Sequence, residues 1–579
     1  MTIVSLLQGR ALACPQRIAC GSPDGQTLTY IDWHERSAVA AGHLAGMIER
    51  GDRVALLFSL ADWIDYAVAY MSVAKAGGVC VPVAEGCSLN ELYDILLQVH
   101  ARLLITSYPV DAGACRQVTV SELARVGPTF ARRPPSSSEP AEILFTSGTT
   151  GSPKPVTATH ANLAHHISAR RGSQTTPAII CHATAFASNA AQTMLIEPLG
   201  PSGSTVITAQ ILDARTLDAV TKRFGVSEII ASPATLITLA ASDEHDFSSI
   251  RRVNAVAAPV TPAHLRRIAE SFRNATIVNI YTSTEAWPAR TTLHLGDGPV
   301  DSVGRPRGGS DVVIVGPDDI PAGPGEIGDI ALSLPPNVPP RSHFGARATV
   351  GSLVKTGDVG FLDDGGYLYI VDRETDVINV GGAKIYSLEV EAALAELPAV
   401  SDVAVVGISH ETLGEYAVAV VTLNEPASVV ELRRKIRARL GTRKMPHEIV
   451  VLSVLPRNAS GKVDKQTLRE RLVQRTEAAS PNWSEVDADL LAPSGVDTDL
   501  LARVTRAWEQ ALDVNDLDGN DNFFASGGNS LLAMQIVVGL SEELGVDLPT
   551  NVFFEWTTIT EMTEVIQACL QPEGIVDDG

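Results

Sequence analysis

At residues 143–156 an apolar strand, ILF, runs directly into a loop dense in glycine and hydroxyl residues, TSGTTGSPKPV. The glycines let successive backbone amides point into one concavity, and serine and threonine hydroxyls add further donors. Lys154 supplies a cation at the end of the loop. Such a loop suits phosphate, although a polar surface turn has a similar composition. It is not a Walker A loop, because Pro155 follows Lys154 where that motif needs Ser or Thr. The residues predicted to bind phosphate are Thr146, Ser147, Gly148, Thr149, Thr150, Gly151 and Lys154.

This loop resembles the phosphate loop of the ANL superfamily of adenylate-forming enzymes, which comprises acyl-CoA synthetases, luciferases and adenylation domains of nonribosomal peptide synthetases. The family usually has glycine after the lysine, and Pro155 removes one backbone donor here. The resemblance implies an α/β and α+β multidomain fold, with a large N-terminal adenylation subdomain and a small α+β C-terminal subdomain. It also implies a ligase that uses ATP and Mg²⁺ to adenylate a carboxylic acid.

A second motif, NIYTSTEAWPA at residues 279–289, matches the family's N-x-Y-x-x-T-E stretch. The resemblance implies that Tyr281 stacks on adenine and that Thr284 lies near the phosphates. It also implies that Glu285 binds the magnesium ion, a role that suits a carboxylate because Mg²⁺ prefers oxygen ligands. Taken alone, the same residues would fit the polar end of a strand. We therefore expect Thr284 and Glu285 to be catalytic because they follow the phosphate loop in the order that the family shows.

A third motif, TGDVGFLDDGGYLYIVDR at residues 356–373, is similar to the family's T-G-D…D-R pattern. It implies that Asp358 accepts hydrogen bonds from both ribose hydroxyls, which the paired oxygens of a carboxylate allow. Arg373 is expected near the same sugar or the phosphates, with a surface ion pair as the alternative. In the family the second residue after this arginine is the pivot of a mobile subdomain. That count gives Thr375, with Asp376 beside it, as the hinge.

Two further motifs carry the remaining chemistry. Lys462, in PRNASGKVDK, resembles the family's catalytic lysine, which lies between the carboxylate and the α-phosphate, where a cation stabilises developing negative charge. Ser530, in DNFFASGGNSLLAMQI, resembles the serine of peptidyl carrier proteins that receives 4′-phosphopantetheine. The alternative for Ser530 is a serine that only caps a helix. The resemblance to carrier proteins adds a four-helix domain to the expected fold.

The length of 579 residues predicts several domains, since single cores stop growing well below this size. The predicted boundaries are an N-terminal adenylation subdomain at 1–374, a mobile C-terminal subdomain at 375–474, a linker at 475–497, a carrier domain at 498–571 and an acidic tail at 572–579.

A net charge of −22 argues against nucleic acid and anionic membranes as partners. No apolar run approaches the length of a membrane helix, and no signal peptide is evident, so a cytoplasmic location is expected. The seven cysteines include no CxxC pair, which predicts reduced thiols and neither disulfides nor a zinc site.

The stretch HATAFASNAAQTML at 182–195 falls where the family builds its acyl pocket. Phe186 resembles the gating aromatic of that pocket, or is an ordinary core aromatic. Adenylation domains for α-amino acids usually have an aspartate after this aromatic to pair with the substrate's ammonium, and this stretch has none. Burying an ammonium without a carboxylate is costly. The predicted acid is therefore not a standard α-amino acid. The residues expected to line its pocket are Phe186, Asn189, Ala257 and Ile280.

Together these resemblances imply an adenylation domain fused to a carrier domain, as in nonribosomal peptide biosynthesis. Such a chain would need a phosphopantetheinyl transferase to modify Ser530 and a downstream synthetase or tailoring enzyme in trans. One alternative is an acyl-CoA synthetase with a helical tail, against which the Gly-Gly-Asn-Ser site argues. The other is an inactive binding protein, against which the joint retention of four motif residues argues: Lys154, Glu285, Asp358 and Lys462.

Overall fold

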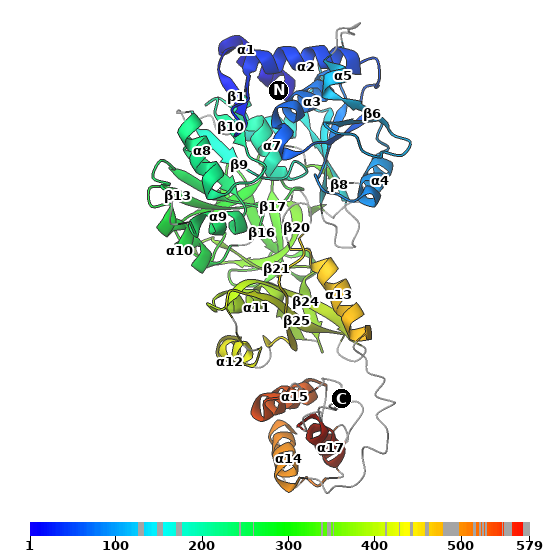
Figure 1. Cartoon of the computed structure of the whole chain (residues 1–579), viewed down its shortest axis with the longest axis vertical. Helices are drawn as coiled ribbons and strands as arrows, with labels where there is room; N and C mark the ends of the chain where they lie inside the picture. Colours follow the sequence, from blue (N-terminus) through cyan, green and yellow to red (C-terminus); the bar gives the residue numbers. More distant parts are fainter. Residues whose placement is uncertain are drawn as a thin grey trace, which may run out of the picture. The chain divides into compact units, whose positions relative to one another are not determined.

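The structure is a computed structural model, and it describes most of the chain. The described residues are 1–124, 132–146, 154–168, 177–242, 245–258, 260–336, 338, 340–343, 349–350, 353–381, 383–410, 414–425, 427, 429–440, 444–457, 463–478, 497–512, 514, 517–519, 521, 523, 526, 530–546, 548 and 558–570. The chain divides into two compact units (Figure 1). Unit 1 comprises Met1–Glu374 with Arg457–Lys462, and unit 2 comprises Thr375–Pro456 with Val463–Gly579.

Unit 1 contains a mostly parallel sheet, sheet A, whose central strands are short apolar runs. Buried parallel strands are apolar on both faces, because helices cover each side. Its order is β15 (Arg305–Arg307), β14 (Arg290–His294), β13 (Thr276–Tyr281), β12 (Arg252–Ala255), β11 (Glu228–Ala231), β9 (Ile179–His182), β10 (Thr205–Thr208), β1 (Ile18–Gly21) and β2 (Thr27–Thr29).

A second sheet of unit 1, sheet B, carries the strands that flank the glycine-rich loop. Its order is β18 (Ser342–His343), β8 (Lys154–Thr159), β7 (Pro140–Thr146), β4 (Val79–Val83), β3 (Arg53–Leu57), β5 (Leu103–Thr106) and β6 (Arg116–Thr119). β7 and β8 are antiparallel, with Thr146 opposite Lys154. The loop therefore joins two hydrogen-bonded neighbours.

Helices fill the space between the two sheets and cover sheet A. The helices of unit 1 are α1 (Ile3–Ala13), α2 (Tyr30–Leu44), α3 (Trp63–Ala76), α4 (Leu89–Gln98), α5 (Val120–Leu123), α6 (His160–Ser168), α7 (Asn189–Ile196), α8 (Ala214–Phe224), α9 (Pro233–Ala240) and α10 (Pro262–Ser271), with short turns η1 (Leu60–Asp62), η2 (Glu197–Leu199) and η3 (Pro317–Asp319). α8, α9 and α10 pack on one face of sheet A (Figure 1). α3 and α7 share a core with strands of both sheets.

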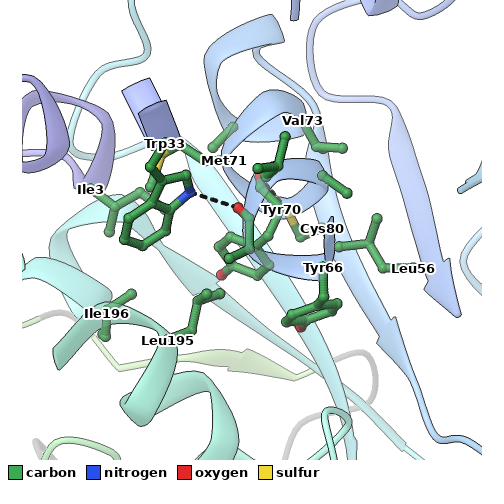
Figure 2. Close-up of a cluster of buried hydrophobic side chains, with 14 of the residues drawn as sticks. Ile3, Trp33, Leu56, Tyr66, Tyr70, Met71, Val73, Cys80, Leu195 and Ile196 are labelled. Carbon is green, nitrogen blue, oxygen red and sulfur yellow. Dashed lines mark hydrogen bonds between the residues drawn. The ribbon is translucent and has the colours of Figure 1, made fainter. Parts of the chain in front are cut away.

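α3 is apolar nearly all round, as expected for a helix buried on every side. Its aromatic side chains Tyr66 and Tyr70 lie in the same buried cluster as Trp33, which donates a hydrogen bond to the Ala67 carbonyl (Figure 2). Leu195 of α7 and Cys80 of β4 belong to this cluster as well. One large core of unit 1 therefore joins α3 and α7 with strands of both large sheets.

Strands between Asp311 and Arg373 form sheet C, also in unit 1. Its order is β16 (Asp311–Val315), β17 (Gly328–Ser333), β20 (Leu353–Leu362) and β19 (Thr349–Val350), with β21 (Leu368–Arg373) paired to β20. β20 and β21 form an antiparallel hairpin whose turn includes Gly366 at φ 73°, a left-handed conformation that glycine adopts without strain.

Unit 2 begins with an α+β part built on sheet D. Its strands are β23 (Ala383–Tyr386), β22 (Val377–Val380), β25 (Gly414–Leu423) and β24 (Val400–His410), with β26 (Glu448–Val451) parallel to β25, and its helices are α11 (Ser387–Ala395), α12 (Val429–Leu440) and α13 (Lys465–Ala478). The C-terminal part has α14 (Thr498–Leu512), α15 (Ser530–Leu544) and α17 (Ile559–Leu570) around a core that includes Trp508 and Phe523. These three are the described helices of the predicted carrier.

The expected α/β and α+β multidomain class is confirmed by these sheets and helices. Within the described ranges, no helix is long and apolar enough to cross a bilayer.

Candidate active site

The predicted phosphate loop is anchored by its two flanking residues. Thr146 ends β7 and Lys154 begins β8, and the Thr146 hydroxyl lies 3.5 Å from the Lys154 carbonyl oxygen. Both side chains are half-buried. The loop residues between them, Ser147, Gly148, Thr149, Thr150 and Gly151, lie outside the described residues, so their phosphate contacts stay a prediction.

Tyr281, Asp358 and Arg373 come together from three strands. The Tyr281 hydroxyl lies 2.7 Å from Oδ2 of Asp358 and 2.9 Å from Oγ1 of Thr356. Asp358 pairs across the β20–β21 hairpin with Arg373, whose half-exposed guanidinium has Nε 3.5 Å from Oδ1 of Asp358. The motif residues predicted at the nucleoside end of ATP are thus neighbours in space, although they lie far apart in the sequence.

Burial keeps the Tyr281 phenol neutral. Burial raises the pKa of Tyr281 well above its usual value, and the negative charge of Asp358 raises it further. The hydroxyl therefore remains a donor to Asp358 at any physiological pH. This contact fixes one carboxylate oxygen and leaves Asp358 only partly covered, with 14% of its side chain exposed. A carboxylate held in this way can still accept hydrogen bonds from a diol.

Thr284 and Glu285 lie in the turn that follows β13, at the carboxyl edge of sheet A. Ala286 in this turn donates its amide to the Ser283 hydroxyl at 3.1 Å, and Glu285 is 9% exposed. In the described part of the chain, no group of three or more His, Cys, Asp and Glu side chains gathers as a metal site. Mg²⁺ is usually held by one or two carboxylates together with substrate phosphates, so a single carboxylate at Glu285 fits that ion.

The residues predicted to line the acyl pocket lie within or after strands of sheet A. Phe186 is 2% exposed, and its ring stacks on Tyr66 at a centroid distance of 4.0 Å. That environment matches the core-aromatic alternative, and the gating role stays a prediction. Asn189 is the first residue of α7, after the cap Ser188. Ile280 lies half-buried in β13. Parallel α/β sheets bind ligands at this carboxyl edge.

Ala257 has an unusual backbone at the same edge. It follows β12 and has φ 71°, a left-handed conformation that costs a residue with a Cβ about 1 kcal/mol or more. Strained residues of this kind gather at functional sites. Its position beside the end of β13 is consistent with the predicted lining role.

The predicted hinge residues lie where the two units divide, since the division falls between Glu374 and Thr375. Thr375 is exposed in a turn. Asp376 belongs to unit 2, where its Oδ1 lies 2.8 Å from Nη2 of Arg469 and its Oδ2 lies 3.7 Å from Nζ of Lys465. Its side chain is therefore held by α13.

The side chains of Lys462 and Ser530 both lie outside the described part of the structure. Lys462 lies outside the described residues. Ser530 is the first residue of α15, as expected for a serine at a helix N-terminus, and its side chain is outside the described part. Both roles stay predictions.

Sequence reasoning missed a buried polar cluster in unit 1. Glu142 of β7 accepts a hydrogen bond from the Tyr70 hydroxyl at 2.9 Å, and Gln192 of α7 donates to the Tyr66 hydroxyl at 2.7 Å. Arg341, immediately before β18, is buried and interacts electrostatically with Glu142 and Tyr70. A glutamate inside the apolar strand AEILF was the available signal, because a charge rarely lies at such a position without a partner.

Three protein-family models match successive parts of this chain. Residues 7–338 match the model for "AMP-binding enzyme", 389–462 match "AMP-binding enzyme C-terminal domain", and 502–566 match "Phosphopantetheine attachment site". A feruloyl-CoA synthase of Amycolatopsis sp is 30% identical over 77% of this chain and 94% of its own length. The phosphinothricin tripeptide synthetase PhsC of Streptomyces viridochromogenes is 28% identical over 98% of this chain and 53% of its own length.

A solved structure shows the same fold. The o-succinylbenzoate coenzyme A synthetase of Bacillus subtilis, in complex with ATP and magnesium ion, aligns with a TM-score of 0.72 and 27% identity, over 80% of this chain and 99% of its own.

Proposed function

Because the chain belongs to the AMP-binding enzyme family and is an acid-activating ligase with a carrier domain, we propose that it loads a carboxylic acid onto its own carrier. In the first step a carboxylate oxygen attacks the α-phosphorus of ATP, and the bond to the β-phosphate breaks. Pyrophosphate leaves with the electron pair of that bond. In the second step the thiol of a phosphopantetheine arm on Ser530 replaces AMP, and the thiol proton is released.

The observation that carries this proposal is the contact of Tyr281 with Asp358, and of Asp358 with Arg373, in a chain that also has a phosphopantetheine attachment site. Tyr281 and Asp358 would hold the adenosine, while Thr146 and Lys154 flank the loop that would hold the phosphates. Glu285 would bind Mg²⁺, which neutralises charge on the triphosphate. Lys462 would stabilise the charge that develops between the carboxylate and the α-phosphate.

The substrate proposed here is an acid without an α-ammonium group. The stretch at 182–195 has no acidic residue. Asn189, the first residue of α7, falls near the position where α-amino-acid-activating members of the family have an aspartate. A neutral amide does not compensate a buried ammonium, but it accepts a hydroxy, aryl or alkyl acid. An α-amino acid preferred over its deaminated analogue would contradict this, and Glu197, which is buried in η2, would then be the candidate carboxylate.

The test separates the two half-reactions. ATP–pyrophosphate exchange over a panel of acids measures adenylation, and the mass of the holo-chain measures loading. Ser530→Ala should keep exchange at the wild-type rate and abolish the acyl mass shift, because only the thiol carrier is lost. An acyl thioester on the Ser530→Ala chain would refute the carrier assignment.

Transfer to free coenzyme A is the second candidate. The stretch GGAKIYSLEVE at 381–391 is nearer to acyl-CoA synthetases than to most peptide synthetases, and the feruloyl-CoA synthase relative is of that class. Release of acyl-CoA by the Ser530→Ala chain at a rate equal to loading of the wild type would favour it.

A further inference from the structure

Arg341 is a buried cation with unused donors. Only 6% of its surface is exposed, and its Nε and Nη1 have no hydrogen-bond acceptor among the described residues. Unpartnered buried guanidinium nitrogens are rare in folded proteins, because each loses its hydration without replacement. The Arg341 guanidinium would be stabilised by a hydrogen-bond acceptor, which the described side chains do not supply.

Strand register places Arg341 level with Glu142. In β18, Ser342 is opposite Thr157 of β8, and extending this antiparallel register by one residue sets Arg341, which precedes β18, level with Ala158. Ala158 is in turn paired with Glu142 of β7. Directly paired residues share one face of a sheet, so all three side chains point to the same side. Ala158 extends no further than its Cβ, so the two charged side chains face each other across it.

Glu142 also has an unused atom. Its Oε2 accepts the Tyr70 hydroxyl at 2.9 Å, but its Oε1 has no donor among the described groups, although it is fully buried. Glu142 and Arg341 are close enough to sense each other's charge. Burial raises the pKa of Glu142 and the Arg341 cation opposes this, while burial lowers the pKa of Arg341 and the negative charge of Glu142 opposes that. The two groups therefore interact electrostatically although they form no direct ion pair.

The same buried layer reaches the predicted acyl pocket. Gln192 donates one amide hydrogen to the Phe186 carbonyl and the other to the Tyr66 hydroxyl, so its amide orientation is fixed and its Oε1 is left without a donor. Tyr66 stacks on Phe186 and lies one helical turn from Tyr70 on α3, the helix shown in Figure 2. The negative charge of Glu285 also reaches Arg341. Gln192 and Tyr66 thus contact Phe186, which is predicted to line the pocket, while Arg341 senses the charge of Glu285.

We propose that Glu142 and Arg341 together bind a neutral hydroxyl or carboxamide group of the acid that this protein activates, an assignment that rests on the proposed function. A neutral group that both accepts and donates satisfies Arg341 and Glu142 at once. A second carboxylate on the acid would meet the charge of Glu142, and an ammonium would meet the charge of Arg341. Glu142 and Arg341 therefore discriminate against acids that carry a second carboxylate or an ammonium group.

The test compares two matched series of acids in pyrophosphate exchange. One is benzoate with para-hydroxyl, para-carbamoyl, para-carboxyl or para-aminomethyl substituents, and the other is hexanoate with the same groups at its end. In the wild-type chain the hydroxyl and carbamoyl members should exceed the plain and ionic members by about tenfold to a hundredfold in kcat/KM, because an analogue that leaves buried polar groups unpaired is rejected.

The decisive variant is the double substitution Glu142→Gln with Arg341→Met. Removing both charges leaves no uncompensated ion and should fold, whereas either single change leaves one buried charge unpaired. The double variant should lose most of the preference for the hydroxyl or carbamoyl group, with an unchanged KM for ATP. Tyr30→Phe is the matched control: it removes one buried hydrogen bond of unit 1, from the Tyr30 hydroxyl to the Pro198 carbonyl, and should leave the preference intact.

Each outcome decides the proposal. Equal preference in the wild type and the double variant, or a uniform loss with all acids, would show a purely structural pair and overturn the inference while the proposed function stands. Exchange with no acid would contradict the proposed function. The inference is then decided by the rise in unfolding temperature that each acid gives without ATP, which should be largest for the hydroxyl and carbamoyl acids and absent in the double variant.

Discussion

Tyr281 and Asp358 each depend on the other at the proposed nucleoside site. The phenol is kept neutral by burial and by the carboxylate, so it donates its proton permanently to Asp358. Thr356 adds to this arrangement, since its hydroxyl lies 3.0 Å from the Ile330 carbonyl and 3.2 Å from the Asp358 amide. Asp358 is therefore oriented before any nucleotide arrives, which limits the ordering that binding requires.

Tyr281→Phe should raise the KM for ATP about tenfold, because the variant keeps the aromatic ring and loses a charge-assisted hydrogen bond worth about 1.5 kcal/mol. The turnover rate at saturating ATP should change much less. Pyrophosphate exchange at varied ATP measures both. Tyr369→Phe is the control, since its hydroxyl lies 3.3 Å from Asp363 in the same sheet and away from Asp358. An unchanged KM in Tyr281→Phe would mean that Tyr281 does not position Asp358.

At this scale the sequence predicted residues that lie in motifs, and it missed residues that lie in none. Tyr281, Asp358 and Arg373 were identified because each stands in a local pattern with a known chemistry. Glu142 and Arg341 are brought level only by the pairing of β18 with β8, and no local pattern specifies that pairing. The packing of Phe186 on Tyr66 is likewise a tertiary contact that spacing does not show.

At the scale of elements, α13 holds Asp376, one of the two predicted hinge residues. Lys465 at its start lies 2.8 Å from Oε1 of Glu391 and 2.8 Å from the Ser387 hydroxyl, and Arg469 one turn later binds Asp376. These contacts tie Asp376 to α11 and α13 within unit 2. In the described part of the chain Thr375 has no such contacts, and the preceding Glu374 donates its amide to the Gly357 carbonyl of unit 1 at 3.0 Å.

Thr375→Pro should therefore slow thioester formation more than adenylation, because proline fixes φ near −65° at the proposed pivot between the two half-reactions. Single-turnover acylation of the holo-chain and pyrophosphate exchange give the two rates. Thr375→Ala keeps the backbone free and is the control. Equal losses in both half-reactions would place the pivot elsewhere. Asp376→Pro is a poorer test, since it would also remove the contacts of Asp376 with Arg469 and Lys465.

Strand and helix types were more predictable than their order in the sheets. Alternating apolar and amphipathic segments are a local signal of an α/β fold, and the Asp-Gly-Gly sequence at 364–366 is a local signal of a hairpin, which β20 and β21 form. The placement of β18 beside β8 depends on long-range contacts, as does the position of α3 between two sheets. Local patterns specify which face of an element is apolar, but not which partner covers it.

For the whole molecule, buried neutral histidines link folding to pH. Burial lowers the pKa of His182 to about 3, and it lowers those of His160 and His447 to about 4. His182 is held by hydroxyls on both ring nitrogens, with Thr184 at 2.9 Å and Thr208 at 2.8 Å. Neither contact supplies the negative charge that an imidazolium would need. These side chains are therefore neutral in the folded chain and protonate readily once it unfolds.

The sign of the pH effect follows from these values. An unfolded histidine has a pKa near 6.5, so the unfolded chain binds more protons than the folded chain below that pH. The stability that His182 contributes is complete above about pH 6.5, and it is lost as the pH falls toward about 3. As the pH falls through this window, each such histidine should reduce the free energy of unfolding by up to about 1.4 kcal/mol per pH unit.

His182→Gln should make the free energy of unfolding of unit 1 depend less steeply on pH, by the contribution of one histidine, between about pH 6.5 and 4.5, where most carboxylates are still ionised. Denaturant unfolding at a series of pH values measures this slope, with the exposed His100→Asn as the control. A slope that is the same in His182→Gln and in the wild type would show that His182 is already protonated in the folded chain.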